Sequence, residues 1–296
     1  MKKSYLILHF TVLLAGFTGI FGKLISLSEG PLVFYRVLFS AIILFIILTF
    51  FKIEKPDSYR ERFGIAKTGI FITVHWIFFY ASIRYSNISV GVVCYCLTSF
   101  FTAIFDPLIN RKRFDFLQLL LSLLTVVGIS FIFHFDSSYQ LGIIFGIISS
   151  AFAALYTIYN ERLVSGYDSK VINYYQMLGG AVGLGIVSPL YLYFFPEQKV
   201  LPDPMDLFYL LLLALFCTVL LYVSFAEVLK KIPAFTVNLS FNLEPIYAII
   251  LAFIFFGEGK QLNSSFYVGL FCVIGSVILQ SVFTIRRKSR VGELTN

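Results

Sequence analysis

The sequence predicts an all-α integral membrane protein of about ten transmembrane helices, built as two five-helix repeats of opposite topology. Three observations support this prediction: an unusually apolar composition, long apolar runs joined by short polar links, and basic residues concentrated in alternate links. Hydrophobic residues make up 58% of the chain and charged residues 13%. A soluble domain has roughly 45–50% and about 25%.

The apolar runs are long enough to cross a membrane, since a helix needs roughly 20 residues to span the hydrocarbon core. The first run carries Lys2 and Lys3, as a signal peptide does, but it is too long and a second run follows closely. We interpret it as an uncleaved first helix. The ten predicted spans are residues 5–25, 32–51, 64–85, 88–110, 116–135, 141–160, 171–195, 207–228, 234–256 and 265–285.

The distribution of basic residues predicts a protein of the cell membrane with both termini cytoplasmic. With the N-terminus inside, 18 of the 23 Lys and Arg residues fall on the inner side. One span more or fewer would scatter them over both faces, so the bias also supports ten spans. The net charge of +7 is therefore a topology signal. We expect membrane lipid as the surrounding partner and no nucleic acid.

The two halves of the chain resemble each other. Residues 90–105 of the fourth predicted span align with residues 235–250 of the ninth at an offset of 145. Because five spans per half is an odd number, the two copies must have opposite orientations. Inverted repeats are typical of transporters, with the substrate site near the midplane. We predict a first repeat over 5–135, a second over 141–285 and a basic cytoplasmic tail over 286–296.

The segment Asn242-Leu-Glu-Pro-Ile-Tyr-Ala and the Gly-Glu pair ending at Glu258 resemble the ninth-helix signature of the EamA-type family, in the drug/metabolite transporter superfamily. The resemblance extends over essentially the whole chain. It implies two four-helix bundles around a central cavity, with the fifth and tenth helices peripheral and often used for dimer contacts. It also implies export or exchange of amino acids, metabolites or nucleotide-linked compounds. A homodimer is accordingly one expected partner state.

Glu244 is the strongest candidate for a functional charge because it lies near the middle of the ninth predicted span. A charge at the bilayer centre costs about 2.5–3.5 kcal/mol on insertion scales, so it marks function by default. Pro245 follows it, lacks an N–H and frees a backbone carbonyl one turn earlier. We expect Glu244 to bind a substrate amine or to exchange a proton. The alternative is a structural carboxylate bonded to a neighbouring helix.

The other candidate substrate contacts are polar side chains within the predicted spans. Asn238 and Asn242 lie four residues apart on one helix face, where linking helices is an equal alternative. Arg36 lies near the outer end of its helix, and we favour snorkelling to the interface over binding of an anionic group. His75 can relay protons or remain neutral and hydrogen-bonded. Tyr95 and Ser99 belong to a polar stripe of the fourth span, for which helix packing is an equal alternative. The remaining candidates, which offer a ring and an amide, are Tyr175 and Gln176.

Motifs of catalytic and metal sites are absent from the sequence. It contains no Walker loop, no His-Glu-x-x-His, no Gly-x-Ser-x-Gly and no acidic metal cluster. We therefore predict no catalytic residue, no metal and no cofactor. The prediction is a transporter that moves a small-molecule substrate, an amino acid or similar organic solute, by alternating access, with proton coupling or exchange. The alternatives are a non-transporting scaffold and a membrane enzyme acting on a lipid-linked substrate.

Overall fold

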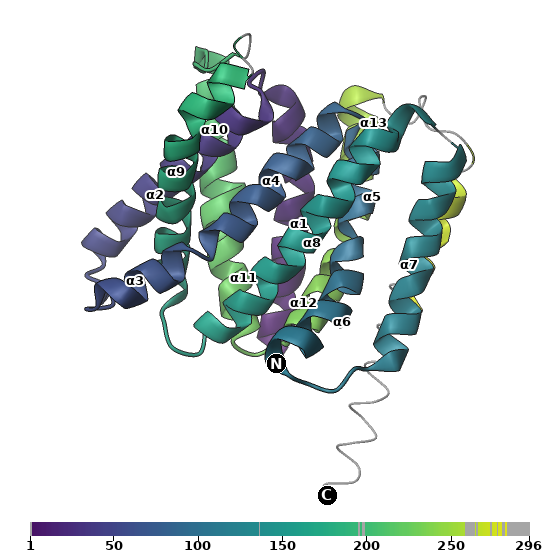
Figure 1. The fold of residues 1–296 in the computed structure, drawn as a ribbon, viewed down its shortest axis with the longest axis horizontal. Coiled ribbons are helices and arrows are strands. Elements are labelled where there is room, and N and C mark those ends of the chain that lie inside the picture. The colour runs from purple at the N-terminus through teal and green to yellow at the C-terminus, as the bar shows by residue number, and fades with distance from the viewer. Residues whose placement is uncertain are drawn as a thin grey trace, which may run out of the picture.

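Helices, turns and links make up the described part of the computed structural model, and most of the helices run side by side (Figure 1). Eight helical segments of the described chain are long and apolar enough to cross a membrane. Shorter apolar helices at Phe116–Gly128 and Phe266–Ser276 correspond to the predicted fifth and tenth spans. The all-helical prediction is therefore confirmed. The structure describes residues 2–135, 137–194, 196, 199–257, 264, 266–272, 274–276, 278–279 and 282.

Five of the predicted spans are single helices, and four are divided. The single helices are α1 (Lys2–Leu24), α2 (Glu29–Phe50), α7 (Phe116–Phe135), α8 (Gln140–Leu163) and α9 (Ser169–Phe194). The divided spans are α3 (Tyr59–Ala66) with α4 (Gly69–Arg84), α5 (Ile88–Tyr95) with α6 (Leu97–Asn110), α10 (Pro204–Ala214) with α11 (Leu221–Leu229), and α12 (Ala234–Phe241) with α13 (Glu244–Phe256). A 3₁₀ turn, η1 (Ser137–Tyr139), precedes α8, and a π-helical segment, η2 (Leu215–Leu220), joins α10 to α11.

Local sequence accounts for several helix ends. The Asn87 side chain caps α5 by accepting the Val90 N–H at 2.8 Å. Asp203 and Asp206 form a capping box at the start of α10. Gly257 ends α13 with φ 64°, a left-handed conformation that glycine adopts without a side-chain clash. These signals account for the start of α5, the start of α10 and the end of α13.

The fourth and ninth spans are interrupted at matching positions. The first break lies at Cys96, which the repeat offset aligns with Phe241, and the second lies at Asn242 and Leu243. At each break the backbone tightens: Cys96 N–H donates to Val93 O at 3.1 Å, and Leu243 N–H donates to Ser240 O at 3.1 Å. Pro245 cannot donate a backbone hydrogen bond, which accounts for the second break.

Helices of the first half pack directly on helices of the second half: α4 on α8, α2 on α9, and α1 on α13 and α11. Glycines permit the closest approaches. A β-carbon on Gly146 of α8 would lie 2.5 Å from Cys94 Cβ on α5, and one on Gly179 of α9 would lie 2.3 Å from the Ala66 carbonyl oxygen. The two halves therefore form one continuous core.

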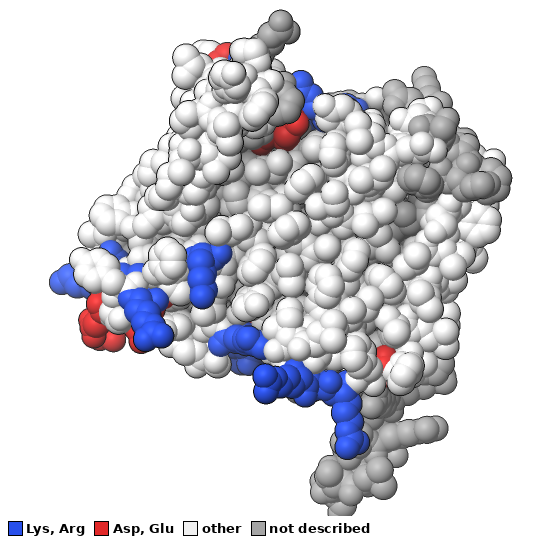
Figure 2. Space-filling view, viewed as in Figure 1, with Lys and Arg blue, Asp and Glu red and all other residues white. Residues whose placement is uncertain are grey.

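Charge is concentrated at the ends of the bundle. In the face shown in Figure 2, Lys and Arg gather along the lower edge, the end at which Figure 1 places the N-terminus, and an uncharged band covers the middle. We call the end that holds the N-terminus the proximal end and the opposite end the distal end. An uncharged band between charged ends is the surface that a bilayer requires.

Candidate functional site

A small cavity lies in the interior, where α1, α4 and α5 meet α11, α12 and α13. The space open to the centre of a water molecule is about 20 Å³, which is room for about one water. A larger solute therefore requires the surrounding helices to move apart. Both halves of the chain supply the lining, which consists of Ala15, Thr18, His75, Trp76, Phe79, Tyr95, Leu221, Tyr222, Phe241 and Glu244. We call this the central cavity.

Glu244 supplies the acidic group of the central cavity. It is the first residue of α13, directly after the break in the ninth span, and only 4% of it is exposed. The positive end of the α13 dipole lies at this position, so the backbone presents N–H groups near the carboxylate. The break therefore brings a carboxylate to the interior at a point where the backbone hydrogen bonds of the helix are interrupted.

Aromatic rings form most of the wall around Glu244. The Trp76 indole N–H donates to Tyr222 OH at 3.2 Å, and the two rings meet edge to face with centroids 5.3 Å apart. The centroid of the Tyr95 ring lies 5.4 Å from that of the His75 ring and 6.5 Å from that of the Phe241 ring. A carboxylate among aromatic faces suits a solute that joins an ammonium group to an apolar body.

His75 enters the central cavity from α4 and is anchored by α8. Its Nδ1 atom lies 2.8 Å from Ser149 Oγ and 3.1 Å from the Ser149 carbonyl oxygen. Ser149 Oγ in turn donates to the His75 carbonyl oxygen at 3.0 Å. The carbonyl is an acceptor, so a hydrogen on Nδ1 fits this arrangement, and the histidine is placed beside Tyr95 and near Glu244.

Arg36 is fully buried, with 0% exposed, so the expectation that it snorkels to the interface is wrong. Its guanidinium donates to Thr218 Oγ1, Tyr80 OH and the Cys217 carbonyl, each at 2.8 Å. It also lies over the Trp76 ring, 3.7 Å from the centroid. Two of the three acceptors belong to the π-helical segment η2. The backbone hydrogen-bond pattern of this segment differs from that of an α-helix and turns polar groups toward α2.

The amides of Asn238 and Asn242 make hydrogen bonds between helices. Asn238 donates to Thr102 Oγ1 at 2.8 Å and accepts from Thr157 Oγ1 at 3.1 Å, which ties α12 to α6 and α8. The Asn242 amide lies 3.1 Å from Ser99 Oγ, across the two matching helix breaks. This geometry favours the helix-linking alternative for these residues, which lie next to the central cavity without lining it.

Tyr175 and Gln176 of α9 lie outside the central cavity. Gln176 donates to Thr68 Oγ1 at 2.9 Å and to Asn160 Oδ1 at 3.2 Å, while Tyr175 packs on Tyr174 with ring centroids 5.0 Å apart. The structure therefore brings together Glu244, His75 and Tyr95 and separates them from this pair.

The cavity lining also includes residues that the sequence did not single out as ligands. Trp76 and Tyr222 form a hydrogen-bonded wall, and Thr18 and Phe79 complete it. Among 35 Phe and 18 Tyr residues a single ring carries little signal. Trp76 is the only tryptophan of the sequence and directly follows His75. This position beside a candidate residue is the sequence signal that could have pointed to the cavity wall.

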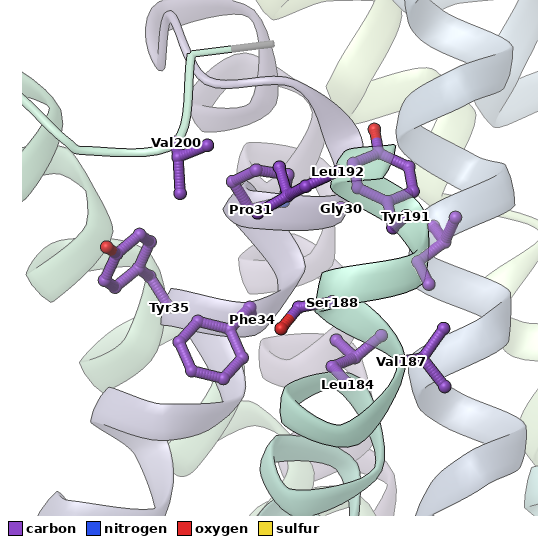
Figure 3. A pocket seen from close by; sticks show the side chains of 11 residues that line it. Gly30, Pro31, Phe34, Tyr35, Leu184, Val187, Ser188, Tyr191, Leu192 and Val200 are labelled. Atoms are coloured by element: carbon purple, nitrogen blue, oxygen red, sulfur yellow. The ribbon is translucent and has the colours of Figure 1, made fainter. Parts of the chain in front are cut away.

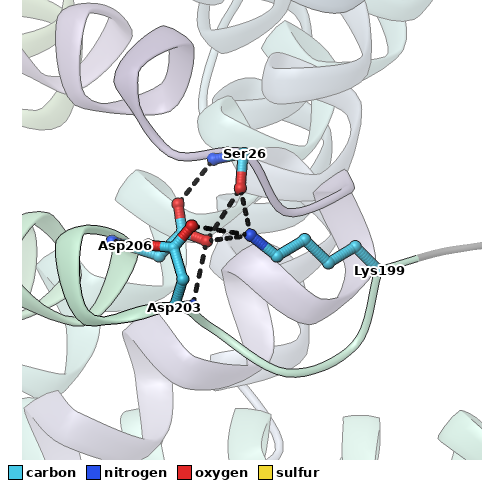
Figure 4. Close-up of polar contacts among 4 residues, drawn as sticks. All are labelled: Ser26, Lys199, Asp203 and Asp206. Atoms are coloured by element: carbon cyan, nitrogen blue, oxygen red, sulfur yellow. Dashed lines mark hydrogen bonds and ion pairs between the residues drawn. The ribbon is translucent and has the colours of Figure 1, made fainter.

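A polar cluster closes the distal end, and we call it the distal clasp: Ser26, Lys199, Asp203 and Asp206 (Figure 4). Asp206 accepts the Ser26 backbone N–H at 2.7 Å and lies 2.7 Å from Lys199 Nζ. Hydrogen bonds to Asp206 and Asp203 raise the pKa of Lys199, and the pKa of Asp203 is lowered chiefly because it accepts the Asp206 backbone N–H. The clasp joins the α1–α2 link to the α9–α10 link, so it ties the two halves together.

A second cluster, the proximal clasp, closes the other end. Arg162 at the end of α8 donates to Asn110 Oδ1 at 2.6 Å and to the Ile109 carbonyl at 2.8 Å, at the end of α6. Lys112 pairs with Asp106 at 3.1 Å. This clasp also connects the first half to the second, and the central cavity lies between the two clasps. Each clasp therefore joins the two halves at one end of the bundle.

An apolar groove on the side of the bundle contrasts with the central cavity. It has a volume of about 210 Å³ and lies between α2 and α9, where Phe34 and Tyr35 face Leu184 and Ser188 (Figure 3). Its lining is almost entirely apolar. In a bilayer such a groove meets acyl chains, so we do not assign polar solute binding to it.

Comparison with known proteins agrees with the architecture. The sequence model of the EamA-like transporter family matches residues 2–134 and 140–282. An uncharacterized transporter of Clostridium kluyveri is 22% identical over 94% of this chain and 93% of its own length. GDP-fucose transporter 1 of Dictyostelium discoideum is 24% identical over 65% of this chain and 53% of its own. One crystal structure is similar with a TM-score of 0.69, 12% identity and coverage of 95% of this chain and 98% of that one, which shows a shared fold.

Proposed function

The chain belongs to the EamA-like transporter family, and on that premise we propose that it moves a small organic solute, an amino acid or similar metabolite, across the cytoplasmic membrane by alternating access. It is a multi-pass membrane transporter and not an enzyme. The observation that carries the proposal is Glu244, a buried carboxylate in an aromatic cavity that both halves line.

In the proposed cycle, one clasp opens while the other stays closed. Opening the distal clasp separates the α1–α2 link from the α9–α10 link, and opening the proximal clasp separates α6 from α8. Movement of the halves enlarges the central cavity beyond the one-water size of the closed state. Glu244 then accepts either the ammonium group of the solute or a proton in exchange for it.

The other candidate residues take supporting roles in this proposal. Tyr95 and His75 contact the solute beside Glu244, because they line the same cavity. Arg36 holds the Trp76 wall in place through its stacking contact. Asn238, Asn242 and Ser99 link α12 and α13 to the fourth span, so they transmit movement between the halves. Tyr175 and Gln176 lie outside this pathway.

The proposed orientation places the proximal end in the cytoplasm, in keeping with the sequence prediction that both termini are cytoplasmic. The support is the positive-inside rule applied to the basic residues that gather at that end. Export or exchange of the solute is part of the proposal, as the family resemblance implies. A homodimer through the peripheral α7 agrees with its exposed apolar residues Phe116, Leu120 and Leu123. Repeats over 5–135 and 141–285, with a tail over 286–296, complete the proposed organisation; the tail lies outside the described residues.

Counterflow in proteoliposomes tests the proposed function. Labelled amino acids, nucleosides, sugars and amines are compared for wild type, Glu244→Gln and the exposed control Glu54→Gln. We expect saturable exchange of one class, unchanged by the control and about tenfold slower or more in Glu244→Gln, because a charge-assisted bond of about 1.5–3 kcal/mol is lost. Wild-type exchange by Glu244→Gln, with unchanged pH dependence, would remove Glu244 from the mechanism. Correctly folded protein that transports none of the panel would favour a scaffold.

A further inference from the structure

Arg36 is a fully buried cation whose hydrogen-bond partners are all neutral: a threonine hydroxyl, a tyrosine hydroxyl and a backbone carbonyl. None of the ion pairs found within the described residues includes it. A guanidinium carries five N–H donors, so these three bonds leave two donors for a further acceptor. A charge in the membrane interior without an opposite charge beside it marks a substrate pathway by default.

The guanidinium of Arg36 lies directly behind the wall of the central cavity. It stacks on Trp76, which lines the cavity, at 3.7 Å from the ring centroid. Its acceptor Thr218 lies one turn before Tyr222, a second lining residue. Tyr222 OH in turn accepts the Trp76 indole N–H at 3.2 Å. A layer of two rings therefore separates the Arg36 cation from the space that holds the Glu244 carboxylate.

The contacts of Arg36 also join the two halves of the bundle. Arg36 belongs to α2 in the first half, and two of its acceptors, Thr218 and Cys217, belong to η2 in the second half. η2 leads directly into Leu221, which lines the central cavity. A carboxylate is an oppositely charged partner that bonds a guanidinium through two parallel hydrogen bonds, whereas a hydroxyl offers one neutral acceptor. A carboxylate that reaches Arg36 can therefore take it from η2.

We propose that Arg36 binds the carboxylate of the transported solute, and that this carboxylate displaces Thr218 as its partner. Separation of the halves, which the proposed function requires, brings the guanidinium into the enlarged central cavity. Arg36 then takes the carboxylate and Glu244 the ammonium group, which selects an amino acid with an apolar body. Loss of the bond to η2 frees α2 from the second half, so solute binding favours opening. This inference rests on the proposed function and specifies the substrate class of the same site.

Three ligands that share one apolar body test the inference: L-leucine, 4-methylpentanoate, which lacks the ammonium group, and 3-methylbutylamine, which lacks the carboxylate. Their affinities are measured by saturation-transfer NMR titration of the full chain in lipid nanodiscs. Arg36→Gln removes the cation, Thr218→Val removes the displaced hydroxyl at nearly constant shape, and Glu244→Gln reports the central cavity. The matched control is Thr11→Val, which removes a buried hydroxyl that bonds the Leu8 carbonyl of its own helix.

Arg36→Gln should bind L-leucine and 4-methylpentanoate about tenfold more weakly or worse, because the charge-assisted bonds are lost. It should bind 3-methylbutylamine as wild type does, which also verifies that the variant is folded. Thr218→Val should bind L-leucine about 2- to 10-fold more tightly, because the solute no longer has to displace the hydroxyl. Thr11→Val should bind all three ligands as wild type does.

Equal weakening of all three ligands in Arg36→Gln would indicate a structural role and overturn the inference. So would a wild type that binds 3-methylbutylamine as tightly as L-leucine. Unchanged L-leucine binding in Thr218→Val would also overturn it, and this variant decides the matter even where Arg36→Gln does not fold. The two proposals fail separately: weaker binding in Glu244→Gln alone would support only the proposed function, whereas weaker binding in Arg36→Gln alone would support Arg36 and remove Glu244.

Discussion

Replacing Asp206 with asparagine is expected to loosen the distal clasp without changing the shape of the side chain. The Asp206 carboxylate accepts from the Ser26 backbone N–H at 2.7 Å and from Ser26 Oγ at 2.8 Å, and it lies 2.7 Å from Lys199 Nζ. Asparagine has no charge and turns an NH₂ group toward these donors. The substitution therefore removes the group on which the contacts between the two halves converge.

The size of the effect follows from the surroundings of each contact. A hydrogen bond to a charged group contributes about 1.5–3 kcal/mol. The Lys199 side chain is 40% exposed, so its ion pair adds only about 0.2–1 kcal/mol. Asparagine retains part of the Ser26 contact, which leaves a net loss of about 2 kcal/mol. A loss of that size shifts the balance between closed and open distal ends by about 30-fold.

Acrylamide quenching of Trp76 measures this shift, because the chain has a single tryptophan and it lines the central cavity. Quenching of Asp206→Asn should exceed that of wild type. The matched control is Asp168→Asn, which affects an exposed ion pair of 3.7 Å with Lys170. Unchanged quenching in Asp206→Asn, or an equal rise in the control, would refute the role of the clasp.

Three further predictions concern the core and the clasp. Arg36→Ala should lower the free energy of unfolding by about 3–5 kcal/mol, because the buried acceptors lose their donor. Thermal denaturation in detergent measures this loss, and a stability within about 0.5 kcal/mol of wild type would contradict the buried network. Gly146→Val should cost about 1–3 kcal/mol through its clash with Cys94, whereas Gly183→Ala, with nothing within 4 Å, should be tolerated; equal tolerance of both would refute the packing. The quenching difference between wild type and Asp206→Asn should stay constant from about pH 5 to pH 9. The pKa of Asp203 is lowered and that of Lys199 is raised, so the distal clasp weakens only in stronger acid or base. A titration midpoint of the quenching difference within this pH range would contradict the prediction.

The sequence predicted the parts of the fold that depend on one-dimensional patterns. Apolar runs and loop charge predicted the spans, and position within a span together with Pro245 marked Glu244 as a candidate, which remains to be tested. These signals follow directly from the cost of placing polar groups in hydrocarbon. The matching break at Cys96 was not predicted, because no proline or glycine marks that position.

Other features depend on contacts between distant parts of the chain, which a single sequence does not encode locally. Arg36 lies near the outer end of its helix, so snorkelling was the expected behaviour, but the π-helical segment η2 supplies buried acceptors for it. The distal clasp joins residues about 180 positions apart, such as Ser26 and Asp206. The amides of Asn238 and Asn242 similarly find partners on other helices.

Locking each end of the bundle in turn tests alternating access most directly. Cysteine pairs at positions 26 and 206 of the distal clasp, and at positions 110 and 162 of the proximal clasp, are crosslinked with a short bifunctional thiol reagent, and counterflow is measured before and after reduction. The account predicts that crosslinking either pair stops transport, that reduction restores it, and that controls with only one of the two introduced cysteines remain active. Transport that continues with either end locked would contradict alternating access through the central cavity.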